Sequence, residues 1–306
     1  MLRRPSGAGR SRTPRRLEPR RGLRTRARRD PMNEEMVMTE NTLTGSGLGT
    51  VLTSPPGEAV EELARRSQEA ALTSGAALTR GLDFTEEAFQ RLVHLLGQTV
   101  DHKFGEGQAD LLLLNASRDE GKVVTGRGPL PLHTDGLLVG EQVDLIVLYA
   151  KDFADEPGSG ETTVCDQLAA WREIPAHLGK VLADGRLEYL VEERGYFPQV
   201  PADWYEIPTT RDYGRVRSLN LALGFPPDVP QGWQVRVAGM DAHDSAAFFA
   251  ELSAHLHSPR YLYQHRWQTG DLLVIDNQRT LHGRTAIGSD GVRLLYRGQV
   301  TLPTTA

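Results

Sequence analysis

Cysteine is almost absent from this chain of 306 residues, since Cys165 is the only one. An internal disulfide is therefore excluded, and a reducing, cytoplasmic setting is the simplest interpretation of the composition. Cys165 ends a β-type run, Thr162-Thr163-Val164-Cys165, and a buried free cysteine usually behaves as a small hydrophobic residue. We interpret Cys165 as a core residue rather than as a nucleophile.

Long hydrophobic runs are absent too. No stretch approaches the roughly 20 apolar residues that a membrane-spanning helix needs, and the run Leu111–Leu114 is better explained as a buried strand. Hydrophobic residues make up 39% of the chain and charged residues 25%, which is ordinary for a globular protein. The composition predicts one large domain or two small ones, without a membrane partner.

Acidic residues are scarce in the first 31 positions, where twelve arginines stand against Glu18 and Asp30 and give a net charge of +10. Because the whole chain has a net charge of −5, the remaining residues carry −15. A basic arm on an acidic body could bind nucleic acid or a membrane surface, and it could also be a transit peptide. The acidic body itself does not suit a nucleic acid as substrate.

Three methionines, Met32, Met36 and Met38, follow the basic arm at once. We favour the interpretation that residues 1–31 reflect an over-extended translation start. The arm has too few apolar residues to fold alone. We therefore expect residues 1–45 to be a disordered extension and residues 46–306 to form the folded domain.

Hydrophobic periodicity separates a helical beginning from a strand-rich remainder. Glu58–Thr73 and Thr85–Leu96 have apolar residues three or four apart, as in amphipathic helices. Short strands and turns follow from Leu111, and the expected strands are Val143–Ala150, Thr162–Asp166, Leu272–Ile275 and Val292–Val300. Two more helices are expected at Pro175–Asp184 and Ser245–Leu256, within an insert at about residues 170–265. The pattern predicts a mainly β domain with flanking helices (α+β), built as a β-sandwich or jelly roll.

A metal-binding pattern stands out in the segment Pro129–Gly136. Two prolines limit strand pairing there, so the segment enters a sheet at an edge or from a loop. In extended chain, residues two apart point the same way, so His133 and Asp135 can face one metal together. One imidazole and one carboxylate, completed by a distant second histidine, form the facial set of oxygen-activating iron(II) enzymes.

The second histidine is predicted to be His282, which follows an apolar strand and a polar turn in the run Gly270–Arg284. Competing histidines are weaker candidates. Those in helical stretches suit surface or capping roles, and the others have no carboxylate partner at metal spacing; they are His94, His177, His255 and His257, and His102, His243 and His265. A lone His-x-Asp tripeptide would be a weak signal by itself.

A chelating cosubstrate needs an anchor for its second carboxylate. Arg293 and Arg297 lie eleven and fifteen residues after His282, and positions 293, 295 and 297 of a strand share one face. A guanidinium gives a permanently charged, two-pronged clamp for a carboxylate, and the Thr162 hydroxyl could add a hydrogen bond. For an isolated arginine, pairing with a surface acid would be the better interpretation.

Together these motifs resemble the taurine dioxygenase/clavaminate synthase-like family. The motifs that carry the resemblance are His133-Thr134-Asp135, Gly160-Glu161-Thr162, Asp276-Asn277, His282-Gly283-Arg284 and Arg293. The resemblance implies a double-stranded β-helix (a cupin-like jelly roll). It also implies Fe(II) on His133, Asp135 and His282, with 2-oxoglutarate and O2 as cosubstrates. Arg293 and Thr162 would hold the far carboxylate of 2-oxoglutarate, with Arg297 beside the same cosubstrate or an anionic group of the substrate.

Further motifs resemble the carbapenem synthase subgroup, which points to antibiotic or other secondary-metabolite biosynthesis. They are Gly121–Gly128, Thr162–Asp166, Glu193–Tyr196 and Arg293–Gln299. The resemblance implies that Trp233, Tyr196 and Arg284 line the substrate pocket. Where that subgroup has a tyrosine that supplies a hydrogen atom during epimerisation, this chain has Phe197, which has no O–H to give. Epimerisation by that route is therefore not expected.

The sequence predicts an Fe(II)- and 2-oxoglutarate-dependent dioxygenase that hydroxylates or desaturates an unactivated C–H bond of a small, anionic molecule. Asp135 argues against a halogenase, because halide would need the coordination place of the carboxylate. Two alternatives stay open, a cupin-like metal-dependent hydrolase or isomerase and a non-catalytic metal-binding module. A homo-oligomer is also open, and no nucleic-acid partner is expected.

Overall fold

The structure is a computed structural model that describes residues 42–100, 110–115, 122–153, 157–197, 199–288 and 293–303. Most of the expected N-terminal extension, residues 1–41, lies outside these ranges. Residues 42–45 of that extension are described, and Thr44 is buried. No helix within the described part of the chain combines the length and the apolar character needed to cross a membrane.

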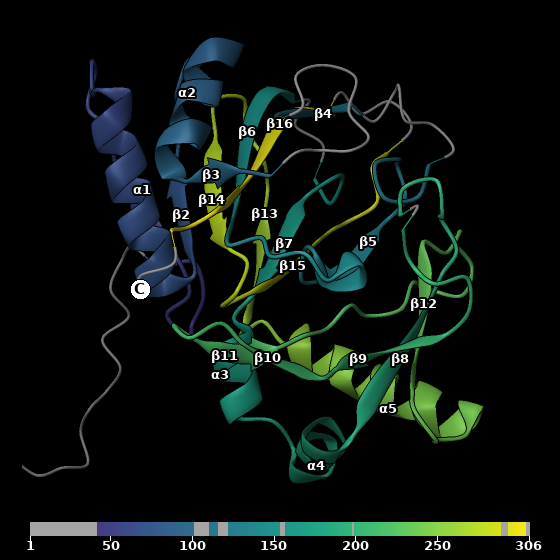
Figure 1. The fold of residues 1–306 in the computed structure, drawn as a ribbon. Helices are drawn as coiled ribbons and strands as arrows, with labels where there is room; N and C mark the ends of the chain where they lie inside the picture. Colours follow the sequence, from purple (N-terminus) through teal and green to yellow (C-terminus); the bar gives the residue numbers. More distant parts are fainter. Residues whose placement is uncertain are drawn as a thin grey trace, which may run out of the picture. The chain divides into compact units, whose positions relative to one another are not determined.

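Two antiparallel β-sheets form the centre of the fold (Figure 1). The seven-stranded major sheet has the order β1 (Thr50–Leu52), β2 (Ala76–Thr79), β14 (Leu272–Asp276), β6 (Leu145–Phe153), β16 (Arg293–Thr301) and β3 (Gln98–Thr99). The seventh strand, β4 (Leu112–Asn115), also pairs with β16. Among the described strands of this sheet, β1 and β2 form the one parallel pair. The four-stranded minor sheet has the order β13 (Leu262–His265), β7 (Thr162–Cys165), β15 (Leu281–Arg284) and β5 (Leu130–His133). This arrangement is the predicted double-stranded β-helix.

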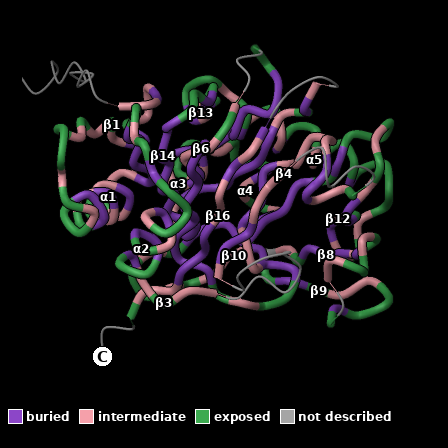
Figure 2. The backbone as a smooth tube through the Cα atoms, turned by 90° about the horizontal axis from the view of Figure 1, so that it is seen from above, coloured by how far each residue is buried: buried purple, intermediate pink, exposed green. Residues whose placement is uncertain are grey.

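The major sheet is buried on both faces, and its alternating side chains show why. Leu145, Val147 and Tyr149 of β6 point to one hydrophobic cluster, whereas Ile146 and Leu148 point to another. The second cluster also contains Val164 of the minor sheet, so it is the core between the two sheets. Figure 2 shows β6, β14 and β16 as largely buried strands.

Two helices cover the outer face of the major sheet, α1 (Val60–Ser74) and α2 (Glu86–Leu96) (Figure 1). Helix α2 packs Phe89, Leu92, Val93 and Leu96 against the sheet, which are apolar positions three or four apart. It starts where the sequence indicates, because the Thr85 hydroxyl accepts the backbone N–H of Ala88 as an N-cap.

An insert between β7 and β13 carries its own hydrophobic core. It contains α3 (Gln167–Arg172), α4 (Ala176–Asp184) and α5 (Ala242–Leu256), the sheet β12 (Trp233–Val237), β8 (Arg186–Val191) and β9 (Tyr205–Pro208), and the hairpin β10 (Thr210–Asp212) and β11 (Arg217–Leu219). The segment Leu221–Leu223 runs beside β5, since Thr134 N donates to Leu221 O and Leu223 N to Leu132 O, both at 2.9 Å. The insert therefore supports the strand that carries His133.

The expected helices and strands are present, with ends that shift by a few residues. The strand expected at Val143–Ala150 begins at Leu145 and continues to Phe153, where it still pairs with β16. The helix expected at Ser245–Leu256 begins three residues earlier, because the Asp241 side chain accepts the N–H of Asp244 as the N-cap. Residues 293, 295 and 297 do lie on one face of β16, which looks toward the minor sheet.

Candidate metal and cosubstrate site

His133, Asp135 and His282 come together at the edge of the minor sheet where β5 ends and β15 begins. His133 ends β5 and is the cross-strand partner of His282 on β15, so the two imidazole rings lie 4.2 Å apart between centroids. Oδ1 of Asp135 lies 3.3 Å from Nε2 of His133 and 3.6 Å from Nε2 of His282. Among the described residues this is the one group whose ligand atoms converge as a metal site requires, within 4.8 Å of one another.

Both imidazoles present Nε2 to that point. Nδ1 of His133 lies 2.8 Å from the carbonyl oxygen of Pro131, which can only accept, so Nδ1 donates there and Nε2 faces the Asp135 carboxylate. Burial and the neighbouring His133 lower the pKa of His282 to about 3, which leaves its ring neutral at physiological pH. Two imidazoles and one carboxylate are donors suited to Fe(II).

Asp135 is held as a carboxylate. Burial raises its pKa, but the charge of Arg297 and the two histidines outweigh burial and keep the pKa well below its ordinary value. Arg297 and Gln299 both donate to Oδ2, the latter at 2.6 Å. Oδ1 is therefore left facing the two histidines, and the Arg297 guanidinium lies on the metal-site carboxylate. The predicted contact of Arg297 with a cosubstrate stays a prediction.

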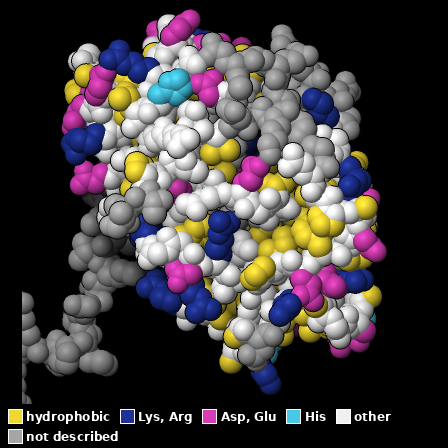
Figure 3. Space-filling model, in the orientation of Figure 1, with side chains coloured by type: hydrophobic (Ala, Val, Ile, Leu, Met, Phe, Trp, Pro, Cys, Tyr) yellow, Lys and Arg dark blue, Asp and Glu magenta, His cyan; other side chains and the backbone are white. Residues whose placement is uncertain are grey.

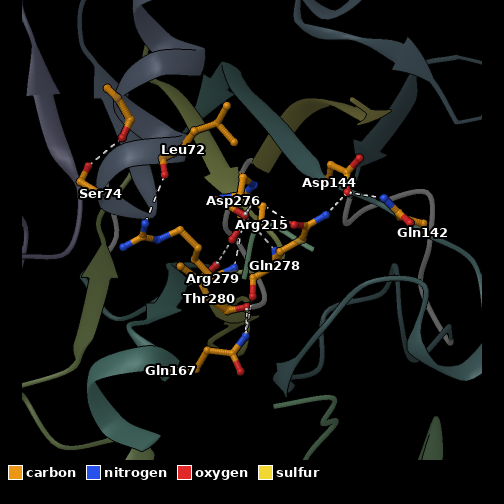
Figure 4. Close-up of polar contacts among 11 residues, drawn as sticks. Leu72, Ser74, Gln142, Asp144, Gln167, Arg215, Asp276, Gln278, Arg279 and Thr280 are labelled. Atoms are coloured by element: carbon orange, nitrogen blue, oxygen red, sulfur yellow. Dashed lines mark hydrogen bonds and ion pairs between the residues drawn. The ribbon is translucent and has the colours of Figure 1, made fainter. Parts of the chain in front are cut away.

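A polar turn, residues 276–280, fixes the backbone around the site. The Asn277 amide accepts the N–H of Asp135 at 3.0 Å and donates to the Asp135 carbonyl at 3.2 Å. Figure 4 shows how the turn is held in place, with the Arg215 guanidinium on both oxygens of Asp276 at 2.8 and 3.0 Å and Gln278 reaching Asp144. The turn leads directly into β15, so it orients the carboxylate and His282 together.

Arg293 lines the same cavity as the metal site. The residue is 6% exposed, and its guanidinium donates from Nε to the Gly160 carbonyl at 3.1 Å. Within the described residues, no carboxylate pairs with it. Burial and the nearby Arg284 lower the pKa of Arg293 well below its usual range, as expected for a cation that lacks a counter-ion. A bound carboxylate would offset that cost.

Gly160 makes room for Arg293. Its φ of +63° lies in the left-handed region, and a Cβ built there would stand 2.9 Å from Cδ of Arg293. Thr162, two residues further on, is 3% exposed and lines the same cavity. The structure therefore brings together the predicted pair Arg293 and Thr162.

Two motifs singled out in the sequence form one wall of the cavity. The Glu193 carboxylate accepts the N–H groups of Val123 and Val124 at 3.0 and 2.9 Å. Arg284 donates to the carbonyls of Val124 and Gly128 at 3.2 and 2.6 Å. The hydrogen bonds of Arg284 thus hold the segment 122–128, and its predicted contact with a substrate stays a prediction.

Aromatic side chains line part of the cavity, which has a volume of about 170 Å³. Trp233 lies with its ring 5.8 Å from that of His133 and donates its N–H to the Leu223 carbonyl. Tyr196 and Phe197, with rings 4.8 Å apart, line the cavity as well. Val139 also lines it and is 37% exposed, so the cavity reaches the surface there. Figure 3 shows hydrophobic side chains gathered on the face where β5 and β12 lie.

Sequence reasoning missed several supporting residues. Gln299 and Glu193 occur in quoted motifs, but nothing in the sequence indicates what they contact. His265, which has no carboxylate partner at metal spacing in the sequence, lies with its Nε2 3.2 Å from Oδ2 of Asp271. Both side chains are fully buried, and no third ligand joins them among the described residues. The pair is therefore a structural contact.

Comparisons with known proteins agree with this geometry. The 2,4-dichlorophenoxyacetate dioxygenase of Burkholderia sp. (strain RASC), which is alpha-ketoglutarate-dependent, is 28% identical over 140 residues, covering 41% of this chain and 43% of that protein. The tyrosine isonitrile desaturase of Erwinia amylovora is 26% identical over 160 residues, covering 51% and 53%. The matches thus span about half the length of these curated relatives.

A solved structure shares the fold. The PvcB protein from Pseudomonas aeruginosa superposes with a TM-score of 0.65 at 23% identity, covering 83% of this chain and 86% of that one. The family described as taurine catabolism dioxygenase TauD, TfdA family matches residues 43–299, a span that contains both sheets, the metal triad, Thr162 and Arg293. This chain therefore belongs to the TauD/TfdA dioxygenase family.

Proposed function

We propose that this protein is an Fe(II)- and 2-oxoglutarate-dependent dioxygenase that hydroxylates or desaturates a small, anionic molecule in secondary metabolism. His133, Asp135 and His282 would hold the iron by two imidazole nitrogens and one carboxylate oxygen. Bound iron, supplied with 2-oxoglutarate and O2, provides an oxidant able to remove hydrogen from an unactivated C–H bond. The chain itself positions the reactants and shields them from water.

The observation that carries the proposal is the buried Arg293 guanidinium. It faces the same cavity as the triad, it has no carboxylate partner within the described residues, and Thr162 lies beside it. A dicarboxylate that chelates the metal at one end would place its other carboxylate there. A cupin-like hydrolase or isomerase needs no such clamp, and a non-catalytic metal-binding module would not need a cation buried at this cost.

Aromatic carboxylates are the first substrates to test. The relatives carry the names of a 2,4-dichlorophenoxyacetate dioxygenase and a tyrosine isonitrile desaturase, and another structure of PvcB is described as an oxygenase from an isonitrile synthetic pathway. Trp233, Tyr196 and Phe197 give this cavity an aromatic lining that suits such molecules. Phe197 offers no O–H to donate, which favours hydroxylation or desaturation over carbapenem-type epimerisation. Since Cys165 is buried and unpaired, we place the protein in the cytoplasm.

The proposal is tested by adding Fe(II) and 2-oxoglutarate to the purified protein without oxygen. A weak visible charge-transfer band of the chelate should appear, and Asp135→Ala and His282→Ala should abolish both the band and the conversion of 2-oxoglutarate to succinate. Arg293→Met should weaken 2-oxoglutarate binding by about 10- to 100-fold, the loss expected for a charge-assisted hydrogen bond. The surface variant Arg236→Met is the control. Bound iron without the band would overturn the proposal.

A further inference from the structure

Trp267 lies outside the cavity lining, yet it touches the group that would bind the cosubstrate. The residue follows β13, is fully buried, and its indole Nε1 lies 3.0 Å from Oγ1 of Thr162. We infer that Trp267 is a positioning residue for 2-oxoglutarate, because its N–H orients the Thr162 hydroxyl to donate toward the far carboxylate. The inference rests on the proposed function and adds a residue to its site.

The direction of the hydrogen bond follows from the chemistry of the two groups. An indole N–H can only donate, so Thr162 Oγ1 must accept. The hydroxyl proton of Thr162 must then point elsewhere, and the structure gives it no acceptor within the described residues. Because Thr162 lines the cavity together with Arg293, that proton is available to an anion bound there. A free threonine hydroxyl, in contrast, could rotate and lose this direction.

Several buried contacts fix the angle of the indole. His265 packs its ring edge-on against Trp267, with centroids 4.3 Å apart and planes at 80°. His265 itself is held by the Tyr263 hydroxyl at 2.9 Å from Nδ1 and by Asp271 at 3.2 Å from Nε2. His265 is also the cross-strand partner of Thr162 in the β13–β7 pair. His265 therefore holds the indole of Trp267 in a fixed position relative to β7, the strand that carries Thr162.

Arg293 and Thr162 would then make different contributions to binding the far carboxylate of 2-oxoglutarate. Arg293 supplies the charge, and its Nε is tied to the Gly160 carbonyl two residues before Thr162. Thr162 supplies one directed, neutral hydrogen bond. Such a bond changes affinity by about three- to tenfold, which is less than the effect of a charged clamp but large enough to measure.

The experiment compares 2-oxoglutarate affinity in wild type and Trp267→Phe by anaerobic titration of the chelate band in the Fe(II)-loaded protein. The variant keeps an aromatic ring but loses the N–H, and its dissociation constant should rise by about three- to tenfold. The dissociation constant of 2-oxopentanoate, which lacks the far carboxylate, should not change. An equal loss for both 2-oxo acids would overturn the inference, because the ring would then act through packing.

A double-mutant cycle with Thr162→Val isolates the contact. If Trp267 acts through the hydroxyl, Trp267→Phe should weaken 2-oxoglutarate binding no further in the Thr162→Val background. Additive losses in the double variant would overturn the inference.

If Trp267→Phe does not fold, benzothienylalanine at position 267 keeps the shape of the indole and removes only the N–H. It should give the same three- to tenfold loss, and unchanged affinity would overturn the inference. A wild-type protein that binds iron but forms no chelate would remove the proposed function, and the inference with it. If the wild type forms the chelate and the variants bind 2-oxoglutarate with wild-type affinity, the inference about Trp267 fails and the proposed function stands.

Discussion

The side-chain amide of Asn277 forms hydrogen bonds with both the N–H and the carbonyl group of Asp135, at 3.0 and 3.2 Å. Its Nδ2 also donates to the Val143 carbonyl at 2.8 Å. Asp135 follows the end of β5, and the hydrogen bonds of Asn277 are what hold its backbone against the major sheet. One amide therefore sets the direction from which the carboxylate approaches the histidines.

We predict that Asn277→Ala weakens Fe(II) binding by about 10- to 100-fold, as changes in groups that orient metal ligands usually do. The ligands would remain, but Asp135 would no longer be aligned with His133 and His282. Anaerobic Fe(II) titration measures the effect. Asn220→Ala is the matched control, since Asn220 is buried and donates to the Pro208 carbonyl away from the ligands. Equal iron affinity in both variants would contradict the role given to Asn277.

The sequence predicts well those features that follow from short-range pattern. The alternation of apolar residues along β6 identifies a strand buried on both faces, and the period of two places positions 293, 295 and 297 together. The spacing of His133 and Asp135 works for the same reason, because two residues of extended chain point the same way. In each case the geometry is fixed within a few bonds of the residues concerned.

The contacts that tune the site are long-range and have no such pattern. Arg215 reaches Asp276 across 61 positions, and Glu193 reaches Val123 across 70. Their partners depend on how the insert folds back on the sheets, which local propensity does not determine. The contact between His265 and Asp271 has no sequence pattern either, because it depends on the turn that precedes β14.

Gly160→Ala should weaken 2-oxoglutarate binding, because the new Cβ would stand 2.9 Å from Cδ of Arg293 and displace the guanidinium. The positive φ adds a backbone strain of about 1 kcal/mol to the destabilisation. The control is Gly158→Ala, where φ is +78° but nothing lies within 4 Å of the added Cβ. Both variants should lose stability to backbone strain in thermal melts, Gly160→Ala more because of the added clash, whereas only Gly160→Ala should need more 2-oxoglutarate for the chelate band. Matching titration curves for the two would exclude the steric argument.

Arg215→Met should destabilise the protein in a pH-dependent way. Burial raises the pKa of Asp276 above its ordinary value, although Arg215 and the backbone N–H groups of the turn lower it. Because the folded-state pKa is the higher one, an ionised Asp276 costs stability at neutral pH, and the cost disappears as the pH falls below the unfolded-state pKa. Without Arg215 the folded-state pKa rises further.

The expected loss is about 3 kcal/mol at neutral pH, the lower end for a broken buried ion pair because Arg215 is partly exposed. It should shrink in mildly acidic solution as Asp276 takes up its proton. Urea unfolding at both pH values measures the difference. Arg186→Met, which removes a surface ion pair with Glu206, should change little at either pH. If the free energy of unfolding lost in Arg215→Met grew toward acid pH, the predicted direction of the pH dependence would be refuted.

Glu193→Ala should loosen one wall of the cavity without touching the cosubstrate clamp. The carboxylate accepts the N–H groups of Val123 and Val124, so both amides lose their acceptor in the variant. Hydrogen–deuterium exchange of the segment 122–128 should speed up by about tenfold or more, the loss expected for hydrogen bonds to a charged group. The affinity for 2-oxoglutarate should stay the same, because Thr162 lies on β7 and Arg293 on β16, outside the segment 122–128. Glu192→Ala is the control, since the neighbouring carboxylate bonds to Gln234 on β12 and not to this segment. Unchanged exchange in Glu193→Ala would contradict the role given to Glu193 in holding this segment.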